Sequence, residues 1–196
     1  QPLLQPLHPN LTWSMDFVHD GLLQGKSFRA FNVIDDFNRE ILNITIDTSL
    51  TSKRVIRELN KVVEWRGKPE RLRVDNGPEF IAQALQDWCG DDVELVFIEK
   101  GKPQQNGYIE RFNRTYREEV LDAFAFDNLN QARLLTHAWM WVYNNERPHS
   151  SLGYKTPRQF LLKYGKLHHP LRGVEFPTFQ QDESLSWNSL ISDATK

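Results

Sequence analysis

The sequence RLRVDNGPEF, residues 71–80, contains the pattern on which the fold assignment rests. Apolar residues at Leu72 and Val74 predict a short buried strand, and Asn76-Gly77-Pro78 is a strong turn signal. Asp75 therefore stands at the end of a strand, where burial of a carboxylate without a counter-charge is costly. We interpret an acid in this position as a candidate functional residue.

Two other acids occur in comparable settings. Asp16 lies in the apolar run WSMDFV, residues 13–18, and Glu110 lies where the loop sequence QQNGYIERFN, residues 104–113, leads into a helix. If the three carboxylates converge, they make a site for hard, oxygen-preferring cations such as Mg²⁺. They are separated by 59 and 35 positions, so the fold and not a local loop would assemble the site.

The predicted elements follow the order three strands, helix, strand, helix, strand and two helices. Strands are expected at residues 12–18, 27–34, 41–48, 72–74 and 93–98, and helices at 51–65, 79–88, 107–124 and 130–143. Three successive strands followed by β-α alternation predict an α/β fold with a five-stranded mixed sheet flanked by helices. The ribonuclease-H-like fold has this layout, with metal-binding carboxylates on the first strand, the fourth strand and a following helix.

Length and composition favour one domain with extensions. The 196 residues are 39% hydrophobic, which is ordinary for a globular protein, and no apolar run reaches the roughly 18 residues of a membrane span. We expect a proline-containing linker at 1–10, a catalytic core at 11–164 and a poorly ordered extension at 165–196. The single cysteine, Cys89, excludes an internal disulfide and a multi-cysteine zinc site, and it favours a cytoplasmic location.

Charge is distributed unevenly. The net charge of −2 argues against a dedicated nucleic-acid-binding module. Residues 51–73 nevertheless carry eight basic and three acidic side chains, and residues 100–118 carry five basic and two acidic ones. The first run could equally be a solvated helix face. The second run surrounds Glu110, and there we favour contact with phosphate.

Two arginines follow Glu110 at helical spacing. Arg114 and Arg117, at +4 and +7, fall within about 40° of Glu110 on one helix face. Guanidinium groups beside a metal-binding carboxylate suit a DNA phosphate, although an intrahelical Glu–Arg pair is the alternative. The preceding loop is predicted to contact DNA bases or sugars, or equally to be a solvated hinge; its polar residues are Lys102, Gln104, Gln105 and Asn106.

Another acidic pair competes with the three candidates. Asp35-Asp36 lies between the second and third predicted strands, in the sequence DDFNR. Because such acids commonly hydrogen-bond their own backbone in turns, we assign this pair to a turn and not to the metal site.

Several segments resemble the integrase catalytic core of bacterial insertion-sequence transposases, in particular the insertion-sequence-three group, whose core is similar to retroviral integrase. They are WSMDFV, VIDDFNR, RVDNGPEF, GKPQQNGYIERFNRTYREEVL and YNNERPHSSLGYKTPRQFL, and the resemblance covers residues 11–162. It implies that Asp16, Asp75 and Glu110 are the DDE triad and that Arg117 is a DNA-contacting residue. The interval between the last two acids is 34 residues, where members usually have 35, and we place the difference in the loop 89–92.

The resemblance also implies an activity. It is Mg²⁺-dependent nicking at the ends of the element, followed by transfer of the 3′-OH onto another phosphodiester, with two metal ions that Mn²⁺ can replace. The expected partners are the terminal inverted repeats, target DNA and further copies of the protein, in a bacterial cytoplasm at the nucleoid. A ribonuclease-H-like nuclease without strand transfer and an inactive, DNA-binding remnant are the alternatives.

Overall fold

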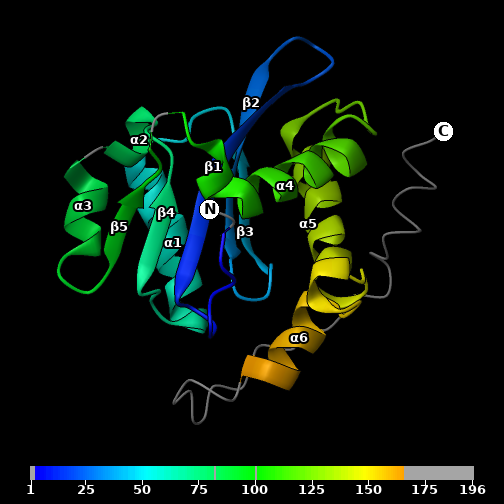
Figure 1. Cartoon of the computed structure of the whole chain (residues 1–196). Coiled ribbons are helices and arrows are strands. Elements are labelled where there is room, and N and C mark those ends of the chain that lie inside the picture. The colour runs from blue at the N-terminus through cyan, green and yellow to red at the C-terminus, as the bar shows by residue number, and fades with distance from the viewer. Residues whose placement is uncertain (1–2, 82, 100, 166–196) are drawn as a thin grey trace.

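The structure, a computed structural model, describes residues 3–81, 83–99 and 101–165. One five-stranded sheet forms its centre, with the order β3-β2-β1-β4-β5 (Figure 1). The strands β1, β2 and β3 are antiparallel neighbours, whereas β4 and β5 run parallel to β1. Their bounds are Thr12–Gly21, Ser27–Asp35, Ile41–Asp47, Arg71–Val74 and Glu94–Phe97. The predicted mixed sheet is therefore confirmed.

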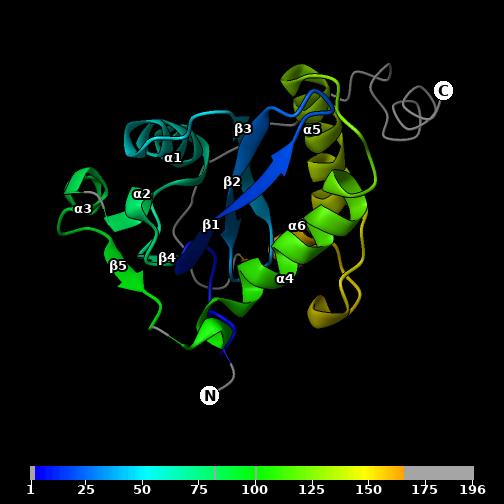
Figure 2. The same cartoon turned by 90° about the horizontal axis from the view of Figure 1, so that it is seen from above.

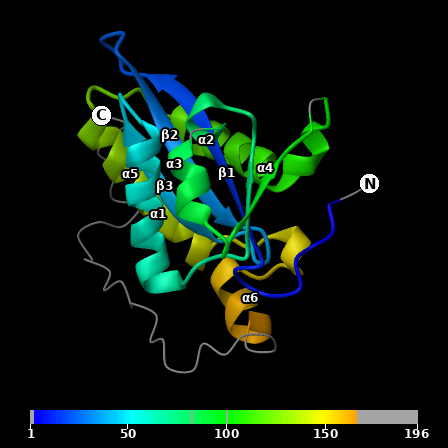
Figure 3. The same ribbon diagram turned by 90° about the vertical axis from the view of Figure 1, so that its left-hand side faces the viewer.

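Helices cover both faces of the sheet (Figures 2 and 3). On one face lie α1 (Ser52–Arg66), α2 (Pro78–Ile81) and α3 (Gln83–Cys89). On the other lie α4 (Gly107–Tyr116) and α5 (Leu129–Asn145). Helix α6 (Pro157–Tyr164) lies below the sheet in Figure 1, where Asn38 of the turn between β2 and β3 donates to the carbonyl of Pro157. Within the described residues, no helix is both long enough and apolar enough to cross a membrane.

The alternation of side chains along the central strands produces two cores. Trp13 and Met15 of β1 point toward α1, α2 and α3, where Leu59 and Phe80 are buried. Val18, on the opposite face of β1, packs into the core that α4 and α5 complete. Because side chains alternate with a period of two, Asp16 belongs to the face that α4 covers. The candidate site therefore forms between the sheet and α4.

Some elements differ from the expectation. The helix expected at 79–88 is two helices, α2 and α3, and the residue between them lies outside the described part. The helix expected at 107–124 is α4 followed by a π-helical turn, Arg117–Leu121, in which the amide of Asp122 bonds to the carbonyl of Arg117 at 2.8 Å. The extension expected at 165–196 lies outside the described residues, apart from Gly165.

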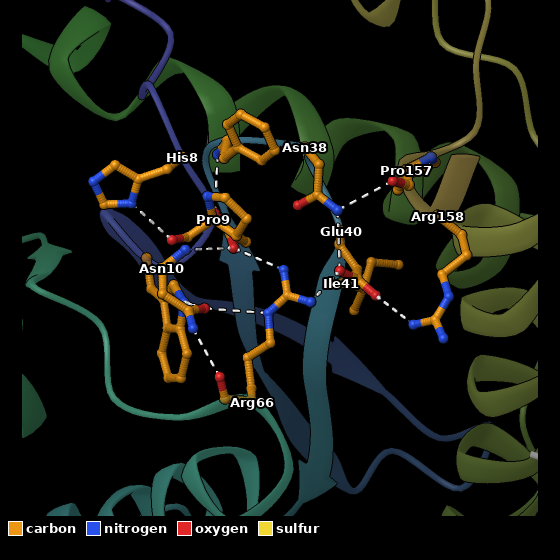
Figure 4. Close-up of polar contacts among 12 residues, drawn as sticks. His8, Pro9, Asn10, Asn38, Glu40, Ile41, Arg66, Pro157 and Arg158 are labelled. Carbon is orange, nitrogen blue, oxygen red and sulfur yellow. Dashed lines mark hydrogen bonds and ion pairs between the residues drawn. The ribbon is translucent and has the colours of Figure 1, made fainter. Parts of the chain in front are cut away.

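The turn between β2 and β3 belongs to a buried polar cluster, here called the polar hub, which consists of Asn10, Asp35, Glu40 and Arg66. As expected for a turn acid, Asp35 accepts a hydrogen bond from the Phe37 amide at 3.0 Å. Its other oxygen binds Arg66 at 2.9 Å, and the same guanidinium binds Glu40 at 3.0 Å and Asn10 at 3.1 Å (Figure 4). The hub therefore joins the last residue of the predicted linker, the end of α1 and the start of β3.

Candidate active site

Strand register brings the first two acids together. β1 and β4 are parallel, and their last registered pair is Ser14 with Arg73. Asp16 and Asp75 each lie two residues beyond this pair, at the same level of the sheet. Partners in a parallel register share a face, so both carboxylates reach the side that α4 covers.

The third acid comes from α4. Glu110 lies in the first turn of this helix and its side chain is exposed, while Ile109 and Phe112 anchor the opposite face of the helix in the core. The amphipathic pattern of α4 thus keeps Glu110 out of the core, on the side of the helix from which its charge acts on Asp16.

Electrostatics link the three carboxylates. The pKa of Asp16 is raised from 3.8 to about 6, first because of burial and further because of the negative charges of Asp75 and Glu110. Hydrogen bonds from the Phe17 amide and Asn113 lower the pKa, but they offset this only in part. Burial and the neighbouring negative charges thus both disfavour the ionised form of Asp16.

Two asparagines orient the Asp16 carboxylate. Asn113, three residues after Glu110 on α4, donates to Asp16 Oδ2 at 2.7 Å. Asn113 in turn accepts from Asn32 of β2 at 2.8 Å, and Asn32 is the register partner of Asp16. Sequence reasoning did not single out these residues, although the spacing of Asn113 from Glu110 on one helix face is a usable signal.

The position of Asp75 depends on Gly77. The amide of Gly77 donates to Asp75 Oδ1 at 2.9 Å, which closes a turn after β4. A Cβ at position 77 would lie 2.9 Å from the same oxygen, a distance that real Cβ atoms do not tolerate. The glycine in the DNG sequence thus leaves room for the carboxylate in its observed position.

The donor chemistry of this site fits a divalent cation. Carboxylate oxygens are the ligands that Mg²⁺ prefers, and the pKa of Asp16 is raised by burial and, to a smaller extent, by the negative charges of Asp75 and Glu110, which a bound cation would offset. As the side chains stand in the described residues, however, no three acids, histidines or cysteines surround a single point closely enough to ligate one ion. The three acids are electrostatically coupled, and binding would require them to draw closer.

Basic side chains lie beside the acids. An open pocket next to Asp16 is lined by Phe17, Val18, His19, Asn113, Arg114 and Arg117. Arg117 donates to the carbonyl of His19 at 2.7 Å and pairs with Asp122 at 3.3 Å. Arg114 is exposed, and its side chain makes no hydrogen bond or ion pair with any residue that the structure describes. Arg114 is thus the more available of the two for an anion.

The loop before α4 holds its polar residues in different environments. Lys102 and Gln105 both bind Glu99, at 2.6 and 2.9 Å, close to the surface. Asn106 is only 2% exposed, and its Oδ1 has no hydrogen-bond partner in the part of the chain described. Contact between Asn106 and DNA would therefore require this loop to move.

Known proteins resemble the chain in sequence. Two models of the integrase core domain match it, at residues 6–103 and 91–157. It is 41% identical to a 31.7 kDa protein of insertion element IS407 from Burkholderia multivorans and 42% identical to a 39.2 kDa protein of IS476 from Xanthomonas euvesicatoria. Each comparison covers 84% of this chain, but only 60% and 48% of those relatives. The chain thus spans about half of the length of the relatives it matches.

Solved structures share the fold. The integrase catalytic core of HTLV-2, determined in complex with magnesium in a trimeric form, has a TM-score of 0.61 at 22% identity, over 80% of this chain and 99% of that one. An intasome chain of simian T-cell lymphotropic virus has a TM-score of 0.70 at 21% identity, over 88% and 59%. The chain therefore has the ribonuclease-H-like fold of these integrase cores, as the sequence predicts.

Among proteins with that fold, the sequence matches are decisive. The chain belongs to the integrase core domain family, and its relatives at 41–42% identity are proteins of bacterial insertion elements. These matches confirm the predicted resemblance to DDE transposases of bacterial insertion sequences.

Proposed function

We propose that the chain is the catalytic core of a DNA transposase that nicks the ends of its element and transfers the resulting 3′-OH to target DNA. The observation that carries the proposal is the placement of a largely buried Asp16 within electrostatic reach of Asp75 and Glu110: burial first, and the charges of these two acids in addition, raise its pKa to about 6. These acids come from β1, the turn after β4 and α4 of an integrase-type fold. In this proposal they are the catalytic triad and the metal ligands.

The residues of the chain prepare an oxygen-rich site for divalent metal. Two bound Mg²⁺ ions would supply activation of a water or a sugar hydroxyl and stabilisation of the oxyanion that leaves phosphorus. Asn113 and the Phe17 amide fix the orientation of the Asp16 carboxylate, and the Gly77 amide fixes that of Asp75. Phosphoryl transfer depends mainly on such positioning and on charge stabilisation.

The basic side chains beside the acids would hold the DNA backbone. Arg114 and Arg117 line the pocket next to Asp16, and Lys102 and Gln105 lie on the loop before α4. We assign phosphate contact to Arg114 first, because Arg117 already binds His19 and Asp122. Asn106 joins the DNA-contacting set only if the loop opens, since its side chain is buried.

The proposed substrates are the terminal inverted repeats of the element and its target DNA. The protein would act as a homo-multimer, because joining two element ends to one target needs two active sites close together. The retroviral integrase core that resembles this chain was determined in dimeric and trimeric forms, which supports a multimer as the working hypothesis.

Strand-transfer assays with pre-nicked element ends test the proposal. The full-length protein should join such ends to target DNA, and should nick intact element ends, in the presence of Mg²⁺ or Mn²⁺. Asp75→Asn should abolish both reactions while the melting temperature stays unchanged. Nicking without joining would favour a nuclease. Binding of the DNA with neither reaction would favour an inactive remnant.

A further inference from the structure

The sequence DDFNR, residues 35–39, touches each element that carries one of the three proposed catalytic acids. The amide of Asp36 donates to the carbonyl of Thr12 on β1 at 3.0 Å, four residues before Asp16. Its carboxylate binds Arg73 on β4 at 2.5 Å, two residues before Asp75. Arg39 reaches α4, as described below. One turn is therefore bonded to β1, β4 and α4.

Arg39 contacts the start of α4 through an aromatic ring. Its guanidinium carbon lies 3.5 Å from the ring centroid of Tyr108, which is two residues before Glu110. The arginine is only 9% exposed, and one of its terminal nitrogens has no hydrogen-bond partner in the described residues. A cation over a ring is favourable where water is excluded, so this contact replaces part of the lost hydration.

The backbone of Arg39 is unfavourable for an arginine. Its φ of +62° lies in the left-handed region, where glycine is the residue without a steric penalty. The turn itself is closed by backbone bonds, from Arg39 to Asp35 at 2.8 Å and from Asp35 to Glu40 at 2.9 Å. These bonds involve only backbone atoms, so they do not require an arginine at position 39. The contact of the guanidinium group with the Tyr108 ring is therefore the interaction that offsets the backbone strain.

We infer that Asp36 and Arg39 are positioning residues, which hold β4 and α4 so that Asp75 and Glu110 face Asp16. This inference rests on the proposed function, since it assigns a purpose to the placement of the acids. It also assigns a role to the turn that the fold alone does not require, because a glycine at position 39 would satisfy the turn.

The discriminating variant is Arg39→Gly. This variant loses the stabilising cation–ring contact and also loses the backbone strain. The two changes alter the free energy of unfolding in opposite directions and by similar amounts, so the protein is expected to remain folded. Amide hydrogen exchange in residues 101–112 should become about 2- to 30-fold faster, the range that corresponds to loss of one cation–ring contact. Lys163→Met is the matched control, because it removes a cation from the ring of Tyr164, 5.2 Å away on α6, outside the site.

Kinetics give the second readout. On pre-nicked DNA with Mg²⁺, Arg39→Gly should lower kcat about 10- to 100-fold with KM changed less than about twofold, as expected for misplaced catalytic groups. Arg39→Lys, which keeps a cation near the ring, should recover part of kcat. Asp36→Asn should accelerate exchange in residues 71–77 and not in residues 101–112, because it acts on β4.

The two readouts separate the inference from the proposed function. If the wild-type protein is inactive on DNA, the proposed function fails, and the exchange data still decide whether Arg39 holds α4. Unchanged exchange in residues 101–112 for both Arg39→Gly and Tyr108→Leu would overturn the positioning role. Faster exchange with an unaltered kcat in an active protein would overturn it as well.

Discussion

Asn113 donates a hydrogen bond to Oδ2 of Asp16 across 2.7 Å, and it thereby connects the helix of Glu110 to the strand of Asp16. Removal of a group that orients a metal ligand typically weakens metal binding 10- to 100-fold. We expect Asn113→Ala to reduce Mn²⁺ affinity by about this factor, measured from the signal of free Mn²⁺ in a titration. Thr115→Ala on the same helix is the control, because among the described residues the hydroxyl of Thr115 bonds only to the carbonyl of Arg111. Equal affinities for the wild-type protein and Asn113→Ala would refute the role of Asn113.

Asp16 should make stability depend on pH in the metal-free protein. Burial and the charges of Asp75 and Glu110 raise its pKa from 3.8 to about 6. Between these values the folded protein keeps a proton that the unfolded chain has lost, so the free energy of unfolding falls as the pH rises through this window. The fall due to Asp16 is at most about 3 kcal/mol.

Burial also raises the pKa of Asp36 to about 6, so a substitution is needed to separate the contribution of Asp16 to the pH dependence of stability from that of Asp36. In Asp16→Asn, stability in EDTA should fall less between about pH 4 and about pH 7 than in the wild-type protein. Urea unfolding at the two pH values measures the difference. Parallel losses in the two proteins would show that Asp16 is not the strained acid.

Gly77→Ala should displace the carboxylate of Asp75 without unfolding the protein. The added Cβ would lie 2.9 Å from Asp75 Oδ1, and a side-chain oxygen can move where backbone cannot. We expect Mn²⁺ affinity and cleavage to fall at least about tenfold, as for other changes that misplace a metal ligand. Gly21→Ala, which would meet nothing within 4 Å, should retain both properties. Normal metal binding in Gly77→Ala would mean that the position of Asp75 is not critical.

The two arginines on α4 and the π-helical turn should behave differently. Arg114→Ala should lower the salt dependence of log K for DNA by about 0.9, one lost phosphate contact, with no change in melting temperature. Arg117→Ala should also lower the melting temperature, because the bonds to His19 and Asp122 are lost. Specific and scrambled DNA should be affected alike, since phosphate contacts carry no sequence information. A salt slope that does not change in either variant would exclude this surface as the DNA site.

The sheet could be predicted because its strands are apolar runs bounded by turns, but some boundaries depend on contacts distant in sequence. β1 continues to Gly21, beyond the expected end at residue 18, because β2 pairs with it along this whole length. Helix α6 was not predicted, although Thr156 and Gln159 form a capping box with Pro157 in the first turn. Its eight residues are too few for a periodic pattern to stand out from the surrounding loop.

The setting of the three acids in the sequence predicts that they share a site, whereas the groups that hold them leave no comparable signal. An asparagine such as Asn113 on an amphipathic helix is usually solvated, and only the fold places it against Asp16. Asp36 lies in the predicted turn, and Asp35 ends β2 and bonds to the turn through the Phe37 amide. The burial of both acids depends on Arg66 and Arg73, which lie 31 and 37 residues away. Such long-range pairs leave no local pattern, so the sequence shows the turn without showing its partners.

Anomalous diffraction from crystals soaked in Mn²⁺ tests most directly whether Asp16, Asp75 and Glu110 form one metal site. Mn²⁺ should be bound by carboxylate oxygens of all three acids, at about 2.0–2.3 Å, and this density should be lost in Asp75→Asn crystals of the same form. Saturating Mn²⁺ that binds elsewhere, and leaves these three carboxylates without a shared ion, would contradict the account.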